Sequence, residues 1–276
     1  MLMKCFGKTS VGKRKKYPPN FVIGAAITGV MLLLILMSFF YTPYDITKMD
    51  SASKLAAPSL LHLMGCDNFG RDIFSRVLKG MENTFVIALL TVMIGTVGGV
   101  MIGAFTGYFG GWLDEVLMRI IDVVFAFPSI LLALVFVSIF GTGRYNVVAA
   151  LGVAFIPSFA RIVRGEFIKY REMDYVKSAQ LAGVGRLRII FVHILPNTFT
   201  VLMSSIMIGF NNAVLAEAGM SYLGIGVQPP DASLGSMLSE SQTYLFSAPW
   251  YAVFPGLMII LLVLGFSLLA DGMKAR

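Results

Sequence analysis

The chain has 276 residues, of which 57% are hydrophobic and 13% charged, and its mean hydropathy is +0.80. Soluble domains carry roughly 25% charged residues, so the composition excludes a soluble protein and indicates an integral membrane protein. The net charge of +7 does not imply a nucleic-acid partner, because membrane proteins collect basic residues in the loops that stay inside the cell.

The first part of the chain predicts a basic cytoplasmic end, a span and an external loop. Residues 1–20 contain six basic residues and no acidic one, so they are expected to stay in the cytoplasm. The uncharged run 21–41 is long enough to cross a bilayer. Residues 42–81 mix both charges with prolines and turn formers, which is typical of a loop. The two cysteines, Cys5 and Cys66, flank the first span and cannot pair.

A second span is expected over 83–105, and its glycines recur every four residues. Glycines at this spacing line one helix face and let another backbone pack closely. The series consists of Gly95, Gly99, Gly103 and Gly107, with Gly111 next. Two interpretations stay open: the stripe packs within this subunit, or it contacts a partner subunit.

The third span is expected over 117–140. Arg119 and Asp122 are spaced i, i+3 near its inner end, which predicts an ion pair on one helix face. Pro128 is predicted to kink this span. An outer turn at 141–145 leads into a fourth span over 146–163, which returns to the inside.

The following loop, 164–197, is a polar segment within the otherwise apolar second half of the chain. Asp174 is a predicted N-cap and Gly183 a predicted C′ residue, so about two helical turns fit between them. Val176, Ala179, Gln180 and Gly183 fall on or near one side of this helix and predict a small-residue surface that another protein could approach closely. The alternative is an amphipathic loop lying on the inner leaflet. The candidate residues are Asp174, Tyr175, Val176, Lys177, Ser178, Ala179, Gln180, Leu181, Ala182 and Gly183.

A second amphipathic segment follows in the same loop and is expected to stop at Pro196. Its apolar residues keep the helical rhythm i, i+3, i+4, i+7, i+8. They are Leu187, Ile190, Phe191, Ile194 and Leu195.

The fifth span, over 198–218, contains the candidate residues of a translocation path: Asn211, Asn212 and Glu217. An acid near the membrane is a functional candidate, because burying it is costly. Glu217 lies close to the outer end, and we favour the interpretation that it reaches water. The outer loop 219–250 has no Lys or Arg, and a sixth span is expected over 251–269. Of the 22 basic residues, six fall outside in this arrangement and sixteen inside, as the positive-inside rule requires.

Four motifs carry a family resemblance, one of which is the short inner turn Tyr108-Phe109-Gly110-Gly111-Trp112-Leu113-Asp114-Glu115. The string Gly65-Cys66-Asp67-Asn68-Phe69-Gly70-Arg71-Asp72, followed by Ser75-Arg76, resembles the Gly-Thr-Asp-x-x-Gly-Arg-Asp-x-x-Ser-Arg pattern of the peptide/nickel branch of ABC-importer permeases, with Cys66 in place of Thr. Lys177-Ser178-Ala179 stands where such permeases have Glu-Ala-Ala, with Gly183 and Leu195-Pro196 in register. The string from Ser221 to Pro230 is similar to the same branch.

The resemblance implies an all-α polytopic protein with six transmembrane helices and the type I ABC-importer permease fold, including a cytoplasmic coupling helix. It implies three parts: the cytoplasmic segment 1–20, the first helix with its external loop over 21–81, and a five-helix core over 82–276 that contains the coupling loop 164–197. The implied location is the bacterial inner membrane, with both termini cytoplasmic.

The implied function is transport of small peptides or of nickel and nickel chelates, delivered by an external binding protein. The implied partners are a second homologous permease, two cytoplasmic ATPase subunits that bind ATP and Mg²⁺, and membrane lipid. The sequence contains no catalytic constellation and no metal-ligand spacing, so this chain is not expected to be an enzyme or to bind a cofactor. The alternative class is a secondary transporter or channel that works without ATP.

Overall fold

The computed structural model describes residues 19–274, which fold into helices joined by loops, without a named strand. Five segments of this part of the chain each contain a helix that is long and apolar enough to cross a membrane. They are α1 (Pro19–Phe40), α2 (Ile73–Phe109), α5 (Arg144–Arg171), α8 (Phe199–Tyr222) with the short helices before it, and α10 (Trp250–Lys274). The pair α3 (Gly111–Phe125) and α4 (Ser129–Phe140) passes the same test as one broken span.

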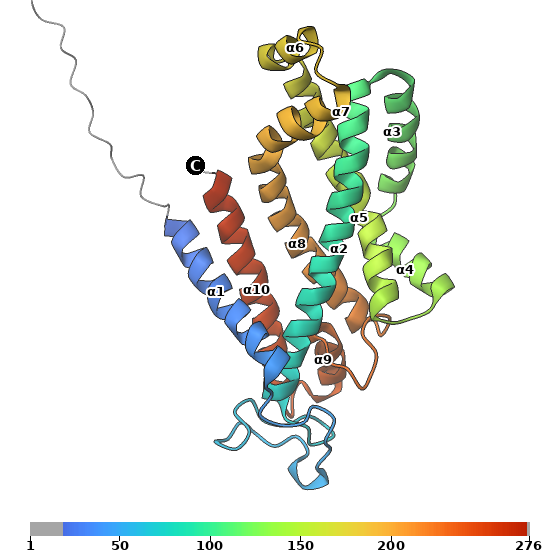
Figure 1. The fold of residues 1–276 in the computed structure, drawn as a ribbon. Coiled ribbons are helices and arrows are strands. Elements are labelled where there is room, and N and C mark those ends of the chain that lie inside the picture. The colour runs from blue at the N-terminus through green and yellow to red at the C-terminus, as the bar shows by residue number, and fades with distance from the viewer. Residues whose placement is uncertain (1–18, 275–276) are drawn as a thin grey trace, which may run out of the picture.

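The short elements lie at the two ends of this bundle (Figure 1). At one end, α6 (Asp174–Leu181) is followed by α7 (Arg186–Arg188), the π-helical η2 (Ile189–Ile194) and the 3₁₀ turn η3 (Leu195–Thr198). At the opposite end lie the loop 41–72, which contains η1 (Ser51–Ser53), and α9 (Leu234–Ser241) with η4 (Gln242–Tyr244). Helix α1 begins, and α10 ends, toward the α6 end.

Helix α2 begins ten residues before the predicted start of the second span, because its first charges are paired within the protein. Asp72 caps the helix by accepting a hydrogen bond from the Ser75 N–H at 2.8 Å. In the first three turns, the Lys79 ammonium lies 2.6 Å from Glu82, and Arg76 binds residues of other segments. At 1.5 Å per residue, 37 residues span about 55 Å. The helix is therefore far longer than the hydrocarbon core, about 30 Å thick.

The glycine stripe packs within this subunit, against α5. A Cβ atom at Gly95 would lie 2.9 Å from the Cβ of Phe155, and one at Gly107 would lie 2.6 Å from the Cβ of Phe167. A Cβ atom at Gly103 would lie 2.5 Å from the backbone oxygen of Ala160. The interpretation as internal packing is therefore confirmed for α2. Gly111 is not part of the stripe, because it starts α3 and nothing lies within 4 Å of its added Cβ.

The third span is broken and not kinked, and its predicted ion pair does not form. Helices α3 and α4 meet at an angle of 86°, with Pro128 preceding the first residue of α4. Arg119 lies 4.0 Å from Glu115, one turn back on the same helix. Asp122 instead binds Arg161 of α5 at 2.6 Å. The i, i+3 spacing was compatible with a local pair, but a cation on the neighbouring helix takes the carboxylate.

Candidate functional site

Helix α6 has one of its two predicted ends where we expected it. Gly183 has a φ of +76°, a conformation that favours glycine. The N–H groups of Gly183 and Val184 donate to carbonyls inside the helix at 3.0 Å each, which closes the C-terminus. The N-cap prediction is wrong, because Met173 occupies that position without a side-chain hydrogen bond and Asp174 lies in the first turn.

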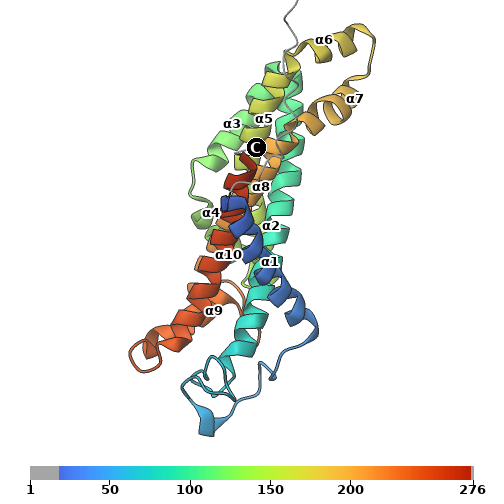
Figure 2. The same cartoon turned by 90° about the vertical axis from the view of Figure 1, so that its left-hand side faces the viewer.

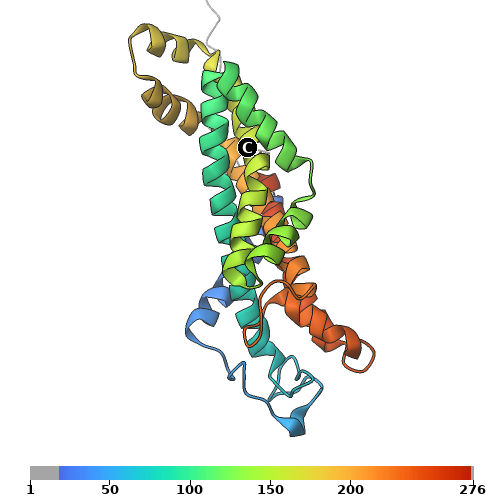
Figure 3. The ribbon, with the colours of Figure 1, turned by 90° about the vertical axis from the view of Figure 1, so that its right-hand side faces the viewer.

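The predicted small-residue face of α6 points into this subunit. Val176 is fully buried, and Ala179 packs on the same cluster, which is formed with Ile189, Ile190 and Ile194. The part of that face formed by Val176 and Ala179 therefore packs within this subunit, whereas Gln180 and Gly183 stay exposed. The opposite side is free: Leu181 is 91% exposed. Figures 2 and 3 show α6 projecting sideways from the bundle.

Polar side chains hold α6 to the segment that leads into α8. From the end of α5, the Tyr170 hydroxyl donates to the carbonyl of Asn197 at 3.1 Å. The Asn197 amide donates to the carbonyl of His193 at 2.6 Å and to the Tyr175 hydroxyl at 3.4 Å. Burial, with Tyr170 nearby, raises the pKa of Tyr175, so this hydroxyl keeps its proton. Helix α6 is thus joined through Tyr175 to η3, the turn that leads into α8.

The sequence predicted that the second amphipathic segment stops at Pro196, and this prediction is wrong. The chain continues through η2 and η3 into α8, with Pro196 inside the 3₁₀ turn. The π-helical stretch changes which residues face inward. Leu187 and Phe191, expected on the buried face, are 58% and 38% exposed.

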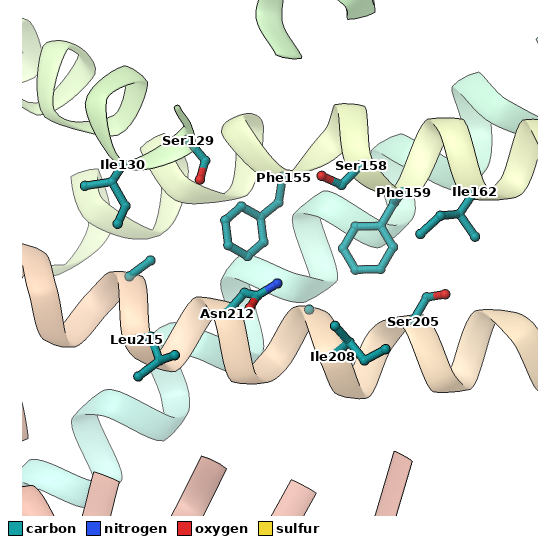
Figure 4. A pocket seen from close by; sticks show the side chains of 12 residues that line it. Ser129, Ile130, Phe155, Ser158, Phe159, Ile162, Ser205, Ile208, Asn212 and Leu215 are labelled. Atoms are coloured by element: carbon teal, nitrogen blue, oxygen red, sulfur yellow. The ribbon is translucent and has the colours of Figure 1, made fainter. Parts of the chain in front are cut away.

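A pocket of about 430 Å³ lies between α4, α5 and α8. Figure 4 shows the rings of Phe155 and Phe159 reaching from α5 toward α8, where the Asn212 amide faces them. The lining contains hydroxyl, amide and apolar groups but no charged side chain. The lining residues are Ser129, Ile130, Phe155, Ser158, Phe159, Ile162, Ser205, Ile208, Gly209, Asn212, Leu215 and Ala216.

The three candidate path residues separate in space. Asn212 is exposed and lines the pocket, whereas its neighbour Asn211 is buried at 9% exposure. Glu217 is fully buried, and it is not among the residues that line the pocket. The interpretation that Glu217 reaches water is therefore wrong. Its position near the end of α8 suggested solvent, but the start of α9 packs on the neighbouring residue, Ala218.

An ionic cluster at the α9 end was not predicted. The Arg76 guanidinium, 1% exposed, binds Glu240 at 3.0 Å and lies 3.5 Å from Asp67. Arg71 binds Asp67 at 2.6 Å, and the Tyr251 hydroxyl donates to Glu240 at 2.6 Å. The Gly-Cys-Asp string thus joins loop 41–72 to α2, α9 and α10. Sequence reasoning missed the contact because Glu240 lies 164 residues after Arg76.

Comparisons with known proteins agree with this arrangement. Residues 99–276 match the family of binding-protein-dependent transport system inner membrane components. The dipeptide transport system permease protein DppC of Alkalihalophilus pseudofirmus is 36% identical, over 92% of this chain and 83% of that protein. The glutathione transport system permease protein GsiD of Pectobacterium atrosepticum is 38% identical, over 91% and 85%.

The fold is also found in a solved transporter. A chain of the MetNI methionine ABC transporter, in an inward-facing conformation, superposes with a TM-score of 0.60 at 17% identity, over 72% of this chain and 95% of that chain. The predicted all-α, membrane-spanning permease fold is confirmed, with five helices long enough to span a membrane among the described residues, or six if the bent pair α3 and α4 forms one span. This chain belongs to the family of binding-protein-dependent transport system inner membrane components.

Proposed function

We propose that this chain is one of two membrane subunits of an ATP-driven importer of small peptides. In this proposal the pocket between α4, α5 and α8 forms part of the translocation path, and α6 docks on an ATPase subunit. The second homologous permease closes the path. Two ATPase subunits bind ATP and Mg²⁺, and an external binding protein delivers the substrate. The observation that carries the proposal is the exposed, anchored helix α6 at the opposite end from α9, in a chain of this family.

The docking surface of α6 is the outward side around Leu181. This side chain is 91% exposed, so it is accessible to a groove on an ATPase subunit. Lys177 stands where the resemblance has Glu, and it lies 3.7 Å from Glu172 on the exposed side. Because Tyr175 joins α6 to Asn197 of η3, which leads into α8, a movement of the ATPase subunit would be transmitted toward the pocket wall.

The chemistry of the pocket favours peptides over bare nickel. Serine hydroxyls and the Asn212 amide can bind peptide N–H and C=O groups. The lining residues include no imidazole, thiol or carboxylate, the ligands that a divalent transition metal prefers. The names of the relatives, a dipeptide and a glutathione permease, support the same substrate class. Since the lining carries no charge, peptides of different charge can share this path.

The basic residues of the loops at the α6 end support a cytoplasmic location for this end. Helix α1 begins, and α10 ends, toward the same end of the bundle, which supports two cytoplasmic termini in the inner membrane. Loop 41–72 and α9 then face the outside, where a binding protein would approach.

The docking assignment can be tested with the complete assembly purified through a tag on this chain. We expect the wild type to retain ATP-hydrolysing subunits, and Leu181→Asp to lose them while remaining in the membrane at normal abundance. Leu60→Asp is the matched control, because Leu60 is 98% exposed at the opposite end. Full ATPase retention by Leu181→Asp would contradict the docking role of α6. A wild-type assembly without ATPase activity would favour a transporter or channel that works without ATP.

A further inference from the structure

Glu217 is a buried acid that has no cation beside it. Its Oε1 atom accepts a hydrogen bond from the Ser221 hydroxyl at 2.7 Å. Its Oε2 atom is buried, and no hydrogen bond to it forms within residues 19–274. Among the same residues, no Lys, Arg or His forms a salt bridge with Glu217. The carboxyl group therefore lacks the partner that a buried negative charge requires.

The charged groups of the packed elements are engaged elsewhere. On α2, Glu82 is held by Lys79 at 2.6 Å. At the end of α9, Glu240 binds Arg76 at 3.0 Å, and on α10 the Tyr251 hydroxyl donates to that same Glu240. None of these cations is free to neutralise Glu217.

Neutral hydrogen-bonding groups surround the carboxyl group instead. The hydroxyls of Thr84, on α2, and Ser233, the N-cap of α9, lie beside it. The same two elements are joined next to Glu217, because the Asn83 amide donates to the carbonyl of Ala232 at 2.7 Å. Gly235 packs directly on the backbone of Ala218, so the start of α9 lies against α8 at the residue after Glu217.

We propose that Glu217 carries a proton and serves as an uncharged joint that positions the start of α9 against α2 and α8. In this form the proton lies on Oε2, beside the hydroxyls of Thr84 and Ser233, while Oε1 accepts from Ser221. An ionised carboxylate could only accept, and it would leave a charge buried among hydroxyl groups. Glu217 is thus a positioning residue and not part of the pocket wall. Only the consequence for uptake rests on the proposed function, in which α9 faces the binding protein.

The protonation is tested by infrared difference spectroscopy of the wild-type assembly against Glu217→Gln, at neutral pH. We expect the difference spectrum to show the carbonyl band of a protonated carboxylic acid, shifted in D₂O. Carboxylate bands in its place would overturn the proposal. This measurement does not depend on transport, so it decides the chemistry even if the proposed substrate is wrong.

The positioning role is tested by comparing two variants of the same residue. Glutamine reproduces the size and hydrogen bonds of the neutral acid, so Glu217→Gln is expected to keep the thermal stability and the peptide uptake of the wild type. Glu217→Ala removes the carboxyl group and is expected to lower both the thermal stability and the peptide uptake. An equal loss in both variants would show that the charge is needed and overturn the protonated form. A Glu217→Ala variant that behaves as the wild type would overturn the positioning role.

Discussion

Replacing Gly99 by alanine is expected to force α2 and α5 apart. The new Cβ would lie 2.8 Å from the backbone nitrogen of Ala160, whereas ordinary contacts begin at 3.4 Å, a deficit of about 0.6 Å. It would also meet the Cβ of Phe159. Neither atom belongs to the flexible end of a side chain, so the helices themselves must move.

The cost can be estimated from two opposing effects. Overpacking a well-packed interior costs typically about 1–3 kcal/mol, and alanine recovers about 0.5–1 kcal/mol of helix propensity over glycine. The net destabilisation should lie within about 0–2.5 kcal/mol and be centred near about 1 kcal/mol. In Gly99→Leu the branched side chain adds to this, and lipid offers no compensating hydrophobic gain. We expect that variant to be lost from the membrane.

The assay is the midpoint of thermal unfolding of the purified assembly in detergent. Gly165→Ala is the matched control, because Gly165 lies on α5 and nothing lies within 4 Å of its added Cβ. This control should be neutral or stabilised by about 0.5–1 kcal/mol. An unfolding midpoint in Gly99→Ala equal to or above that of the control would refute the close packing of α2 on α5.

Three further predictions concern the two ends of the bundle. Arg76→Ala should cost about 3–5 kcal/mol, because it leaves Glu240 and Asp67 short of a buried cation; thermal unfolding would measure it, and an unchanged midpoint would contradict the cluster. Cys66 is fully buried, and burial with nearby Asp72 and Asp67 raises its pKa to about 11. Its thiol is therefore protonated below that pH, and a maleimide should label it only after unfolding. An impermeant maleimide should reach Leu60→Cys in intact cells of a cysteine-free variant but Leu181→Cys only after permeabilisation; the reverse order would invert the topology.

The sequence was sufficient for the spans whose apolar runs are uninterrupted. The runs at 21–41 and 251–269 predicted α1 and α10 to within five residues at each end. The same rule failed for α2, because the charges of Arg76, Lys79 and Glu82 are neutralised by partners and do not end the helix. Local spacing cannot show such pairing when one partner lies 164 residues away.

Orientation was harder to predict than the existence of an element. The spacing of Val176 and Ala179 identified one side of α6 correctly, but a small apolar side can face a partner or its own subunit, and here it covers Ile189 and Ile190. The prediction for Glu217 was wrong for a related reason. Because Glu217 is close to the end of the span, we expected it to reach water, whereas α9 and the turn before it lie over that end. Cys5 and nearly all of the predicted cytoplasmic segment 1–20 lie outside the described residues, which begin at residue 19.

The most direct test of the account is uptake of a labelled dipeptide into proteoliposomes. The assembly would be purified through a tag on this chain and supplied with its binding protein outside and ATP inside. We predict accumulation that needs both ATP hydrolysis and the binding protein, and that stops in Leu181→Asp. Equal uptake with a non-hydrolysable ATP analogue, or without any nucleotide, would contradict the central claim that this chain is the permease of an ATP-driven peptide importer.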